Sequence, residues 1–145
     1  MAQITFHSED ISYTLPDKAL VRRWIIETAA SYGKSVSQVA FVFCSDTYLL
    51  EMNKQYLQHD YFTDIITFDY SEGDVISGDI FISIDRVQDN AREHRVDNKF
   101  EMQRVVIHGI LHLCGLKDKT KTDAEKMRKS EEIALSKFPQ KHSNP

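Results

Sequence analysis

The pattern of apolar and polar positions along the chain predicts four short strands. Residues 3–6 alternate between the two kinds of side chain, and residues 39–44 form a short apolar run typical of a buried strand. Residues 65–68 and 79–84 predict two further strands by the same criteria. Between them, residues 71–78 (SEGDVISG) are rich in turn-forming residues, so we expect a turn there.

The segments between these strands have apolar residues at helical spacing. The expected helices run from Pro16-Asp17 to Gly33, from a cap at Ser45 or Asp46, over 86–94 as a short helix or turn, from near Asn98 to Gly115, and from a capping box at 122–125. The helix that begins near Asn98 has the widest apolar face, so we expect it in the core. Strands and helices intermix without strict βαβ alternation. The sequence therefore predicts an α+β domain with one mixed sheet and helices packed on it.

Composition narrows the class of protein. The chain has 145 residues, 41% of them hydrophobic and 28% charged, which predicts one globular domain over residues 1–138 with a disordered tail at 139–145. Two distant cysteines are no disulfide framework, and we expect both to be small buried hydrophobes. With no apolar run near ~20 residues and no signal-peptide pattern, we expect a cytoplasmic protein without a membrane segment. The net charge of −4 argues against a general nucleic-acid surface, so DNA is not an expected partner and phosphate contacts must be local.

The segment from His108 to Asp118 carries most of the candidate chemistry. His108 and His112 are four residues apart on an expected helix, which puts both imidazoles on one face about 5–6 Å apart at Cβ. Gly115 can end the helix and turn the chain, so that Asp118 arrives where a third ligand could stand. The pattern H-x-x-x-H-x-x-G-x-x-D has the spacing of the long metzincin zinc motif with its last His replaced by Asp. It predicts a site for one divalent ion, with zinc as the leading candidate and an open position for water.

Other interpretations of this segment stay open. Two imidazoles at this spacing can be ordinary hydrogen-bonded side chains, and two histidines with one carboxylate can also hold iron in an oxygenase. Gly109 stands where zinc proteases of the HExxH type carry their general base, so peptide hydrolysis by that route is disfavoured. No catalytic residue is predicted beyond a metal-bound water.

Basic residues near the histidines are candidates for contact with phosphate. Arg104 lies one helical turn before His108 on the same face, and Lys117 and Lys119 flank Asp118. We take Arg104, Lys117 and Lys119 as candidate substrate contacts. The competing interpretation is a hydrated basic run at the end of a helix.

At these residues the chain resembles the YbeY family of rRNA maturation factors, which are single-strand-specific metallo-endoribonucleases. The family signature H-G-x-L-H-L-x-G-Y-D-H is similar to residues 108–118 (HGILHLCGLKD). A second family segment, Leu-Asn, an aromatic residue and then Thr-Asp-Val-Leu-Ser-Phe, is similar to Met52-Asn53, Tyr56 and residues 63–68 (TDIITF). A third, Gly-Asp-Ile followed by apolar residues, is similar to residues 78–82. Three segments in the family's order argue against chance similarity.

Two departures from the family pattern bear on activity. The family's third metal-binding histidine is Asp118 here, which replaces an imidazole by a carboxylate. The basic residue that the family places after the aromatic of its middle segment is Leu57. His59, or a lysine near Asp118, can substitute for that residue. Solvation of the loop that carries His59 and Asp60 is the simpler expectation.

The resemblance implies an α+β fold like a small zinc-metalloprotease domain, with a metal cleft beside the sheet. It implies a metal-dependent endoribonuclease that acts in the cytoplasm on ribosomal RNA, at the 3′ end of the small-subunit species, and in ribosome quality control, with the small subunit as partner. The alternative is a ribosome-associated assembly factor with a structural or vestigial metal site. The open metal position favours the nuclease, whereas the acidic pI of about 5.8 and Leu57 favour the assembly factor.

Overall fold

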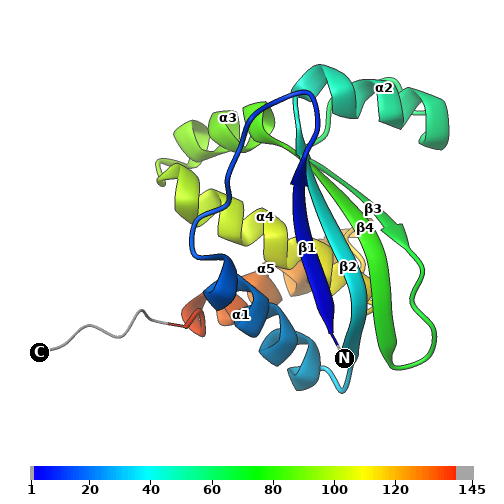
Figure 1. Ribbon diagram of the computed structural model, residues 1–145, viewed down its shortest axis with the longest axis vertical. Helices are drawn as coiled ribbons and strands as arrows, with labels where there is room; N and C mark the ends of the chain where they lie inside the picture. Colours follow the sequence, from blue (N-terminus) through cyan, green and yellow to red (C-terminus); the bar gives the residue numbers. More distant parts are fainter. Residues whose placement is uncertain (1, 140–145) are drawn as a thin grey trace, which may run out of the picture.

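Four strands and five helices make up the computed structural model, which describes residues 2–139 (Figure 1). The strands are β1 (Gln3–Ser8), β2 (Ser35–Cys44), β3 (Ile65–Asp69) and β4 (Val75–Ser83). The helices are α1 (Lys18–Ser31), α2 (Asp46–Leu57), α3 (Ile84–His94), α4 (Asn98–Leu113) and α5 (Lys121–Ser136). None of the helices in this part of the chain is long and apolar enough to cross a membrane.

The strands form one mixed sheet in the order β1-β2-β4-β3. β1 pairs with β2 in parallel and β2 with β4 in parallel, whereas β3 pairs with β4 in the antiparallel direction. The predicted α+β fold with a mixed sheet is confirmed. Its topology leaves β3 at one edge of the sheet, where α4 also contacts it. The loop that enters β3 is therefore brought next to α4.

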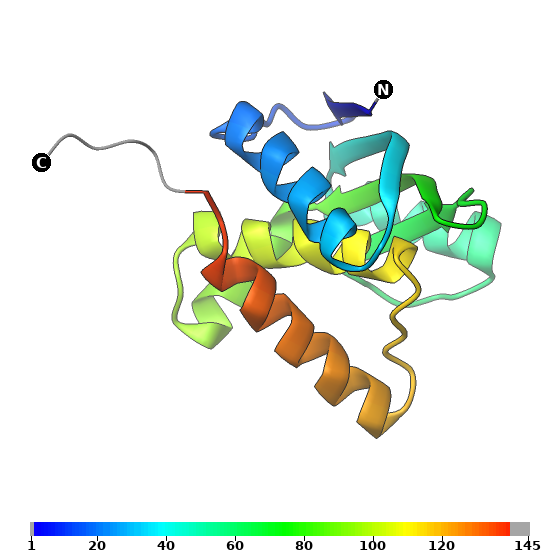
Figure 2. The same ribbon diagram turned by 90° about the horizontal axis from the view of Figure 1, so that it is seen from below.

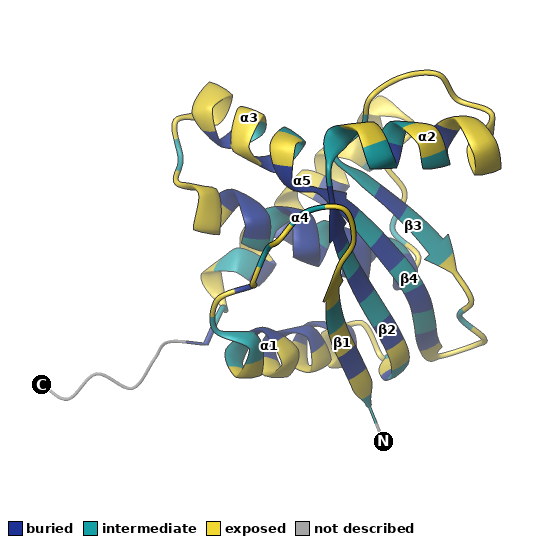
Figure 3. Ribbon diagram, turned by 45° about the horizontal axis from the view of Figure 1, so that its top comes forward, coloured by how far each residue is buried: buried dark blue, intermediate teal, exposed yellow. Residues whose placement is uncertain are grey.

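The two faces of the sheet bury different clusters. Ile80 and Ile82 of β4 pack in the large core with residues of α1 and α4, whereas Phe81 between them packs with Leu49 of α2. Because successive side chains of a strand point to opposite faces, α2 covers the face opposite to α1 and α4. Figure 3 shows α4 as a deeply buried helix, as its apolar pattern predicted, whereas α2 alternates between exposed and buried positions.

The last helix, α5, contacts both α4 and α1. α5 packs against α4 (Figure 2). In addition, the buried Trp24 of α1 donates its indole N–H to the carbonyl of Ala134 over 2.8 Å. Pro139, the first residue of the predicted tail, is buried, and residues 140–145 lie outside the described part of the chain.

Some predicted boundaries were wrong. β4 already begins at Val75, so the turn between β3 and β4 is shorter than the expected 71–78, because Val75 and Ile76 pair with β2 and this pairing outweighs the turn-forming residues. Residues 84–94 form a regular helix. α5 is capped by Thr120, whose hydroxyl accepts from the Asp123 N–H over 3.0 Å, and not by the predicted box at 122–125. A related Thr-x-x-Asp pattern at 120–123 begins two residues before the predicted Thr-x-x-Glu pattern at 122–125.

Two glycines allow α4 and β3 to approach the middle of the sheet. A Cβ at Gly109 would lie 3.0 Å from Cδ1 of Ile80 and 3.1 Å from Cδ1 of Ile65. A Cβ at Gly78 would lie 2.6 Å from the backbone oxygen of Phe68, which is closer than real Cβ contacts come. The position that carries Glu in an HExxH motif thus faces the sheet here, so a side chain at this position would enter the core.

Candidate metal centre

All three predicted metal ligands line one hollow beside β3, of about 210 Å³. His108 and His112 come from α4, where both side chains are half-buried at the border of its apolar face. After Leu113 the chain turns at Gly115, whose φ of +106° favours glycine, and this turn returns Asp118 to the same hollow. The helical spacing and the glycine turn therefore act as the sequence predicted.

Two of the three donors are already at the separation of ligands that share a metal ion. Nε2 of His108 lies 3.3 Å from Oδ2 of Asp118. Two donors bound to one zinc ion at ~2.0–2.1 Å in tetrahedral geometry lie roughly 3.3–3.4 Å apart. Within residues 2–139, however, no three His, Cys, Asp or Glu side chains form a group that could hold a metal ion as they stand. His112 lines the same hollow as these two donors.

A buried carboxylate that the sequence analysis missed holds the other nitrogen of His108. Oε2 of Glu131, on α5, lies 2.6 Å from Nδ1 of His108. With its proton on Nδ1, the imidazole donates to Glu131, and Nε2, the nitrogen nearest Asp118, is the ring atom that could bind a metal ion. The signal for Glu131 was its place among Met127 and Ala134, which share the buried stripe of α5. A carboxylate in a buried stripe needs a partner in the core.

Arg104 is held by two carboxylates. It donates to Oε1 of Glu131 over 3.1 Å and to Oε1 of Glu101 over 3.1 Å, and it also forms an ion pair with Oε2 of Glu101. Arg104 lines a second hollow of about 350 Å³, which also reaches His108 and Asp118. Its position beside the site is as predicted, but much of its charge is balanced by these two acidic side chains.

The charges around His108 favour the protonated form of its imidazole. Burial lowers the pKa of His108, but the hydrogen bond to Glu131 and the negative charges of Glu131, Asp118 and Asp64 outweigh it, so the pKa is raised. Burial would raise the pKa of Glu131, yet the hydrogen bond and charge of His108, together with Arg104, hold it below its ordinary value. Burial raises the pKa of Asp64, which lines the second hollow.

The two candidate lysines stand apart from both hollows. Lys117 and Lys119 are exposed in the segment between α4 and α5, on either side of Asp118. Neither lines the hollows that contain His108, and neither forms an ion pair or hydrogen bond within residues 2–139. Their contact with substrate stays a prediction.

Leu57 at the end of α2 and residues of the loop between α2 and β3 line the hollow that contains the histidines. His59 is exposed, but it lines the same hollow as His108, and so do Leu57 and Tyr61. His59 is thus exposed to solvent, as expected for this loop, and it also borders the hollow that contains His108. The pairing of β3 with β4 at the sheet edge brings this loop to α4, and nothing in the local sequence indicates that placement.

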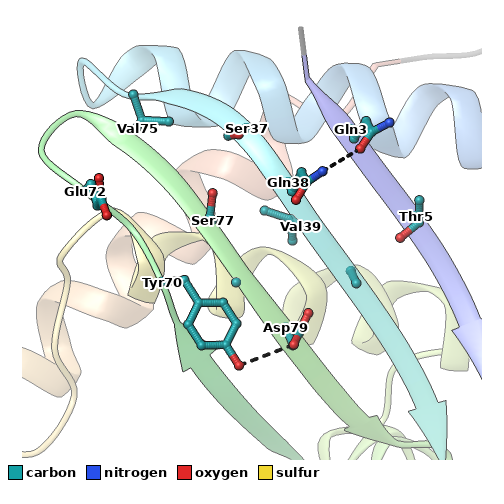
Figure 4. Close-up of a pocket in the computed structure, with 12 residues that line it drawn as sticks. Gln3, Thr5, Ser37, Gln38, Val39, Tyr70, Glu72, Val75, Ser77 and Asp79 are labelled. Carbon is teal, nitrogen blue, oxygen red and sulfur yellow. Dashed lines mark hydrogen bonds between the residues drawn. The ribbon is translucent and has the colours of Figure 1, made fainter.

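A larger hollow, of about 700 Å³, lies on the sheet away from the histidines and is formed by β1, β2, β4 and the turn after β3. Figure 4 shows its polar lining, in which Gln38 donates to Gln3 and the Tyr70 hydroxyl lies 3.4 Å from Oδ2 of Asp79. No histidine or cysteine is among its lining residues, so it offers none of the nitrogen or sulfur ligands that zinc favours.

Comparisons with known proteins identify the family of this chain. The family model of Endoribonuclease YbeY matches residues 3–139. Proteins named Endoribonuclease YbeY are 49% identical in Porphyromonas gingivalis, over 93% of this chain and 89% of that protein, and 51% identical in Phocaeicola vulgatus, over 92% and 96%. The solution structure of TM1509 from Thermotoga maritima superposes with a TM-score of 0.63 at 30% identity, covering 94% of this chain and 91% of that one.

These matches establish the family, whereas the expected likeness to a small zinc-metalloprotease domain stays a prediction. The family model extends over nearly the whole described chain, from Gln3 at the start of β1 to Pro139 after α5. The chain belongs to the Endoribonuclease YbeY family of RNA-cleaving hydrolases.

Proposed function

We propose that this chain is a metal-dependent endoribonuclease that cuts single-stranded RNA. We further propose that it acts in the cytoplasm on ribosomal RNA, at the 3′ end of the small-subunit species, and in ribosome quality control. Membership of the endoribonuclease family supports cleavage of RNA. The observation that carries the metal dependence is the contact of 3.3 Å between His108 Nε2 and Asp118 Oδ2, with Glu131 on the opposite nitrogen of the ring.

His108, His112 and Asp118 are the residues proposed to hold one divalent ion, zinc first. Two imidazoles and one carboxylate are a donor set that zinc accepts, and three protein ligands leave room for water. When bound, such an ion supplies a Lewis acid and lowers the pKa of a water molecule. His112 lines the same hollow as His108 and Asp118 and is the third donor in this proposal.

The chain's own side chains have separable tasks in this proposal. Glu131 accepts the Nδ1 proton of His108 and so fixes which ring nitrogen faces the hollow. The carboxylate of Asp118 is 44% exposed, which leaves the hollow open on the side where RNA must arrive. Leu57 in the wall supplies no charge for phosphate. Affinity for RNA must therefore come from other contacts near the hollow.

Metal analysis combined with an RNA cleavage assay tests this function. Asp118→Ala should purify with much less zinc than the wild type and should lose cleavage of single-stranded RNA, because one of three ligands is missing. Asp60→Ala is a matched control, since it removes a carboxylate from the neighbouring loop that is 82% exposed and lines neither hollow. This control should keep both metal and activity.

Two results would overturn parts of the proposal. Full zinc occupancy in Asp118→Ala would remove that residue from the ligand set. A wild-type protein that carries its metal but does not cut single-stranded RNA would favour the assembly-factor alternative, in which the metal is structural.

A further inference from the structure

The loop between α2 and β3 presents a pair of stacked rings beside the candidate metal centre. The rings of His59 and Tyr61 have centroids 5.0 Å apart and planes inclined by 19°. The Tyr61 hydroxyl and Nδ1 of His59 are 3.0 Å apart and share a hydrogen bond. Both residues are exposed, Tyr61 by 55%. A stacked pair of exposed rings leaves an outer ring face available to a third ring.

A buried asparagine holds this pair in place. The backbone carbonyl of Asn53 accepts from the His59 N–H over 3.0 Å, and the Asn53 side-chain amide donates to the Tyr61 carbonyl over 2.8 Å. Asn53 itself is only 1% exposed. Gln58, with φ of +57°, turns the chain at the end of α2 so that the loop folds back. The two rings are therefore pre-organised by the backbone on each side of them.

The rings line the same hollow as His108, His112 and Asp118. At about 210 Å³, this hollow is smaller than the ~300–1,000 Å³ typical of sites for drug-sized ligands, so it suits one planar group. Every nucleobase has a π-face, and stacking on aromatic side chains is the usual means of holding unpaired bases without reading their sequence. A base within a duplex is already stacked on both sides and cannot use such a surface.

We propose that His59 and Tyr61 form a stacking platform for one unpaired base of the RNA next to the position that is cut. This inference rests on the proposed function and names the contact that gives it single-strand preference. It also answers how a chain with a net charge of −4, and Leu57 in the wall, can hold RNA. Stacking is an affinity term that needs no positive charge and is largely insensitive to salt, unlike contacts to phosphate.

Binding of a short fluorescein-labelled oligoadenylate, followed by fluorescence anisotropy over a range of salt concentrations, tests the platform. Tyr61→Ala should weaken binding by about 5- to 150-fold, which corresponds to the loss of one stacked base. The slope of log affinity against log salt should not change, because no phosphate contact is removed. Tyr61→Phe, which keeps the ring and loses the hydroxyl, should retain most of the affinity.

Tyr70→Ala is the matched control. Tyr70 is 60% exposed, as much as Tyr61, but it lies at the hollow of Figure 4, away from the histidines. Zinc content and circular dichroism are measured on the same preparations, and both should match the wild type in all three variants. The expected pattern is a loss in Tyr61→Ala alone.

The outcomes separate this inference from the function on which it rests. If the wild type binds and cuts RNA but Tyr61→Ala binds equally well, or no worse than Tyr70→Ala, the platform is refuted and the function stands. A changed salt slope in Tyr61→Ala would also refute stacking. If the wild type neither binds nor cuts single-stranded RNA, the proposed function fails and the platform fails with it.

Discussion

Replacing Glu131 by glutamine converts one buried carboxylate into an amide of nearly the same volume. In the wild type, Oε2 accepts from Nδ1 of His108 and Oε1 accepts from Nη1 of Arg104, over 2.6 Å and 3.1 Å. Glutamine has one oxygen, so it can accept from only one of these donors while its amide group faces the other. The imidazole of His108 loses a charged acceptor, and its Nε2 becomes a weaker and less well oriented ligand.

The expected loss of zinc affinity is about 10- to 100-fold, the usual effect of removing a carboxylate that supports a ligating histidine. The cost to folding is smaller. One buried donor loses its partner, which costs about 1–3 kcal/mol, while Arg104 keeps its ion pair with Glu101. A domain with about 5–15 kcal/mol of stability stays folded after such a loss.

Competition for zinc against a coloured chelator measures the affinity, and thermal unfolding without metal measures the fold. Glu132→Gln is the control, because Glu132 is the next residue of α5 and is exposed. It should leave zinc affinity unchanged. Zinc affinity in Glu131→Gln equal to that of the wild type would refute the orienting role of Glu131 and weaken the assignment of His108 Nε2 as a ligand atom.

Further predictions concern packing, thiols and charge. Gly78→Ala should lower the free energy of unfolding by about 1–3 kcal/mol, measured with guanidinium chloride, because its Cβ would meet the neighbouring strand's carbonyl at 2.6 Å; an unchanged midpoint would refute this close approach. Burial raises the pKa of the Cys44 thiol to about 12 and that of Cys114 to about 11, so a thiol reagent at pH 8 should label neither until the chain unfolds. Rapid labelling of the folded protein would contradict their burial. If Lys117 and Lys119 contact phosphate, neutralising both should flatten the plot of log RNA affinity against log salt by up to about two units without changing zinc content; an unaltered slope removes them from the RNA path.

The part of the site that depends on local geometry could be predicted from the sequence. The four-residue spacing of His108 and His112 fixes a shared helix face, and the left-handed turn at Gly115 returns Asp118 to that face. The mixed sheet also followed from the order of apolar segments. These features depend on residues within one helix or one turn, where backbone geometry limits the possibilities.

The parts that depend on tertiary packing could not be predicted in this way. Glu131 reaches His108 only because α5 packs on α4, and the pairing lies 23 residues away along the chain. His59 reaches the hollow because β3 is placed at the sheet edge and Asn53 fixes the loop. Likewise, Val75 joins β4 by pairing with Ser35 of β2, 40 residues earlier in the chain, which its turn-like sequence did not indicate.

The position of α5 has a consequence for the order in which the site matures during translation. During translation His108, His112 and Asp118 are synthesised before Glu131. The hydrogen bond between the Trp24 indole and the Ala134 carbonyl can form only after α5 has been made. A nascent chain that stops before α5 carries every proposed ligand, yet lacks the carboxylate that orients the first of them. If Glu131 orients His108 as proposed, a chain released before α5 is made should bind metal more weakly than the complete chain.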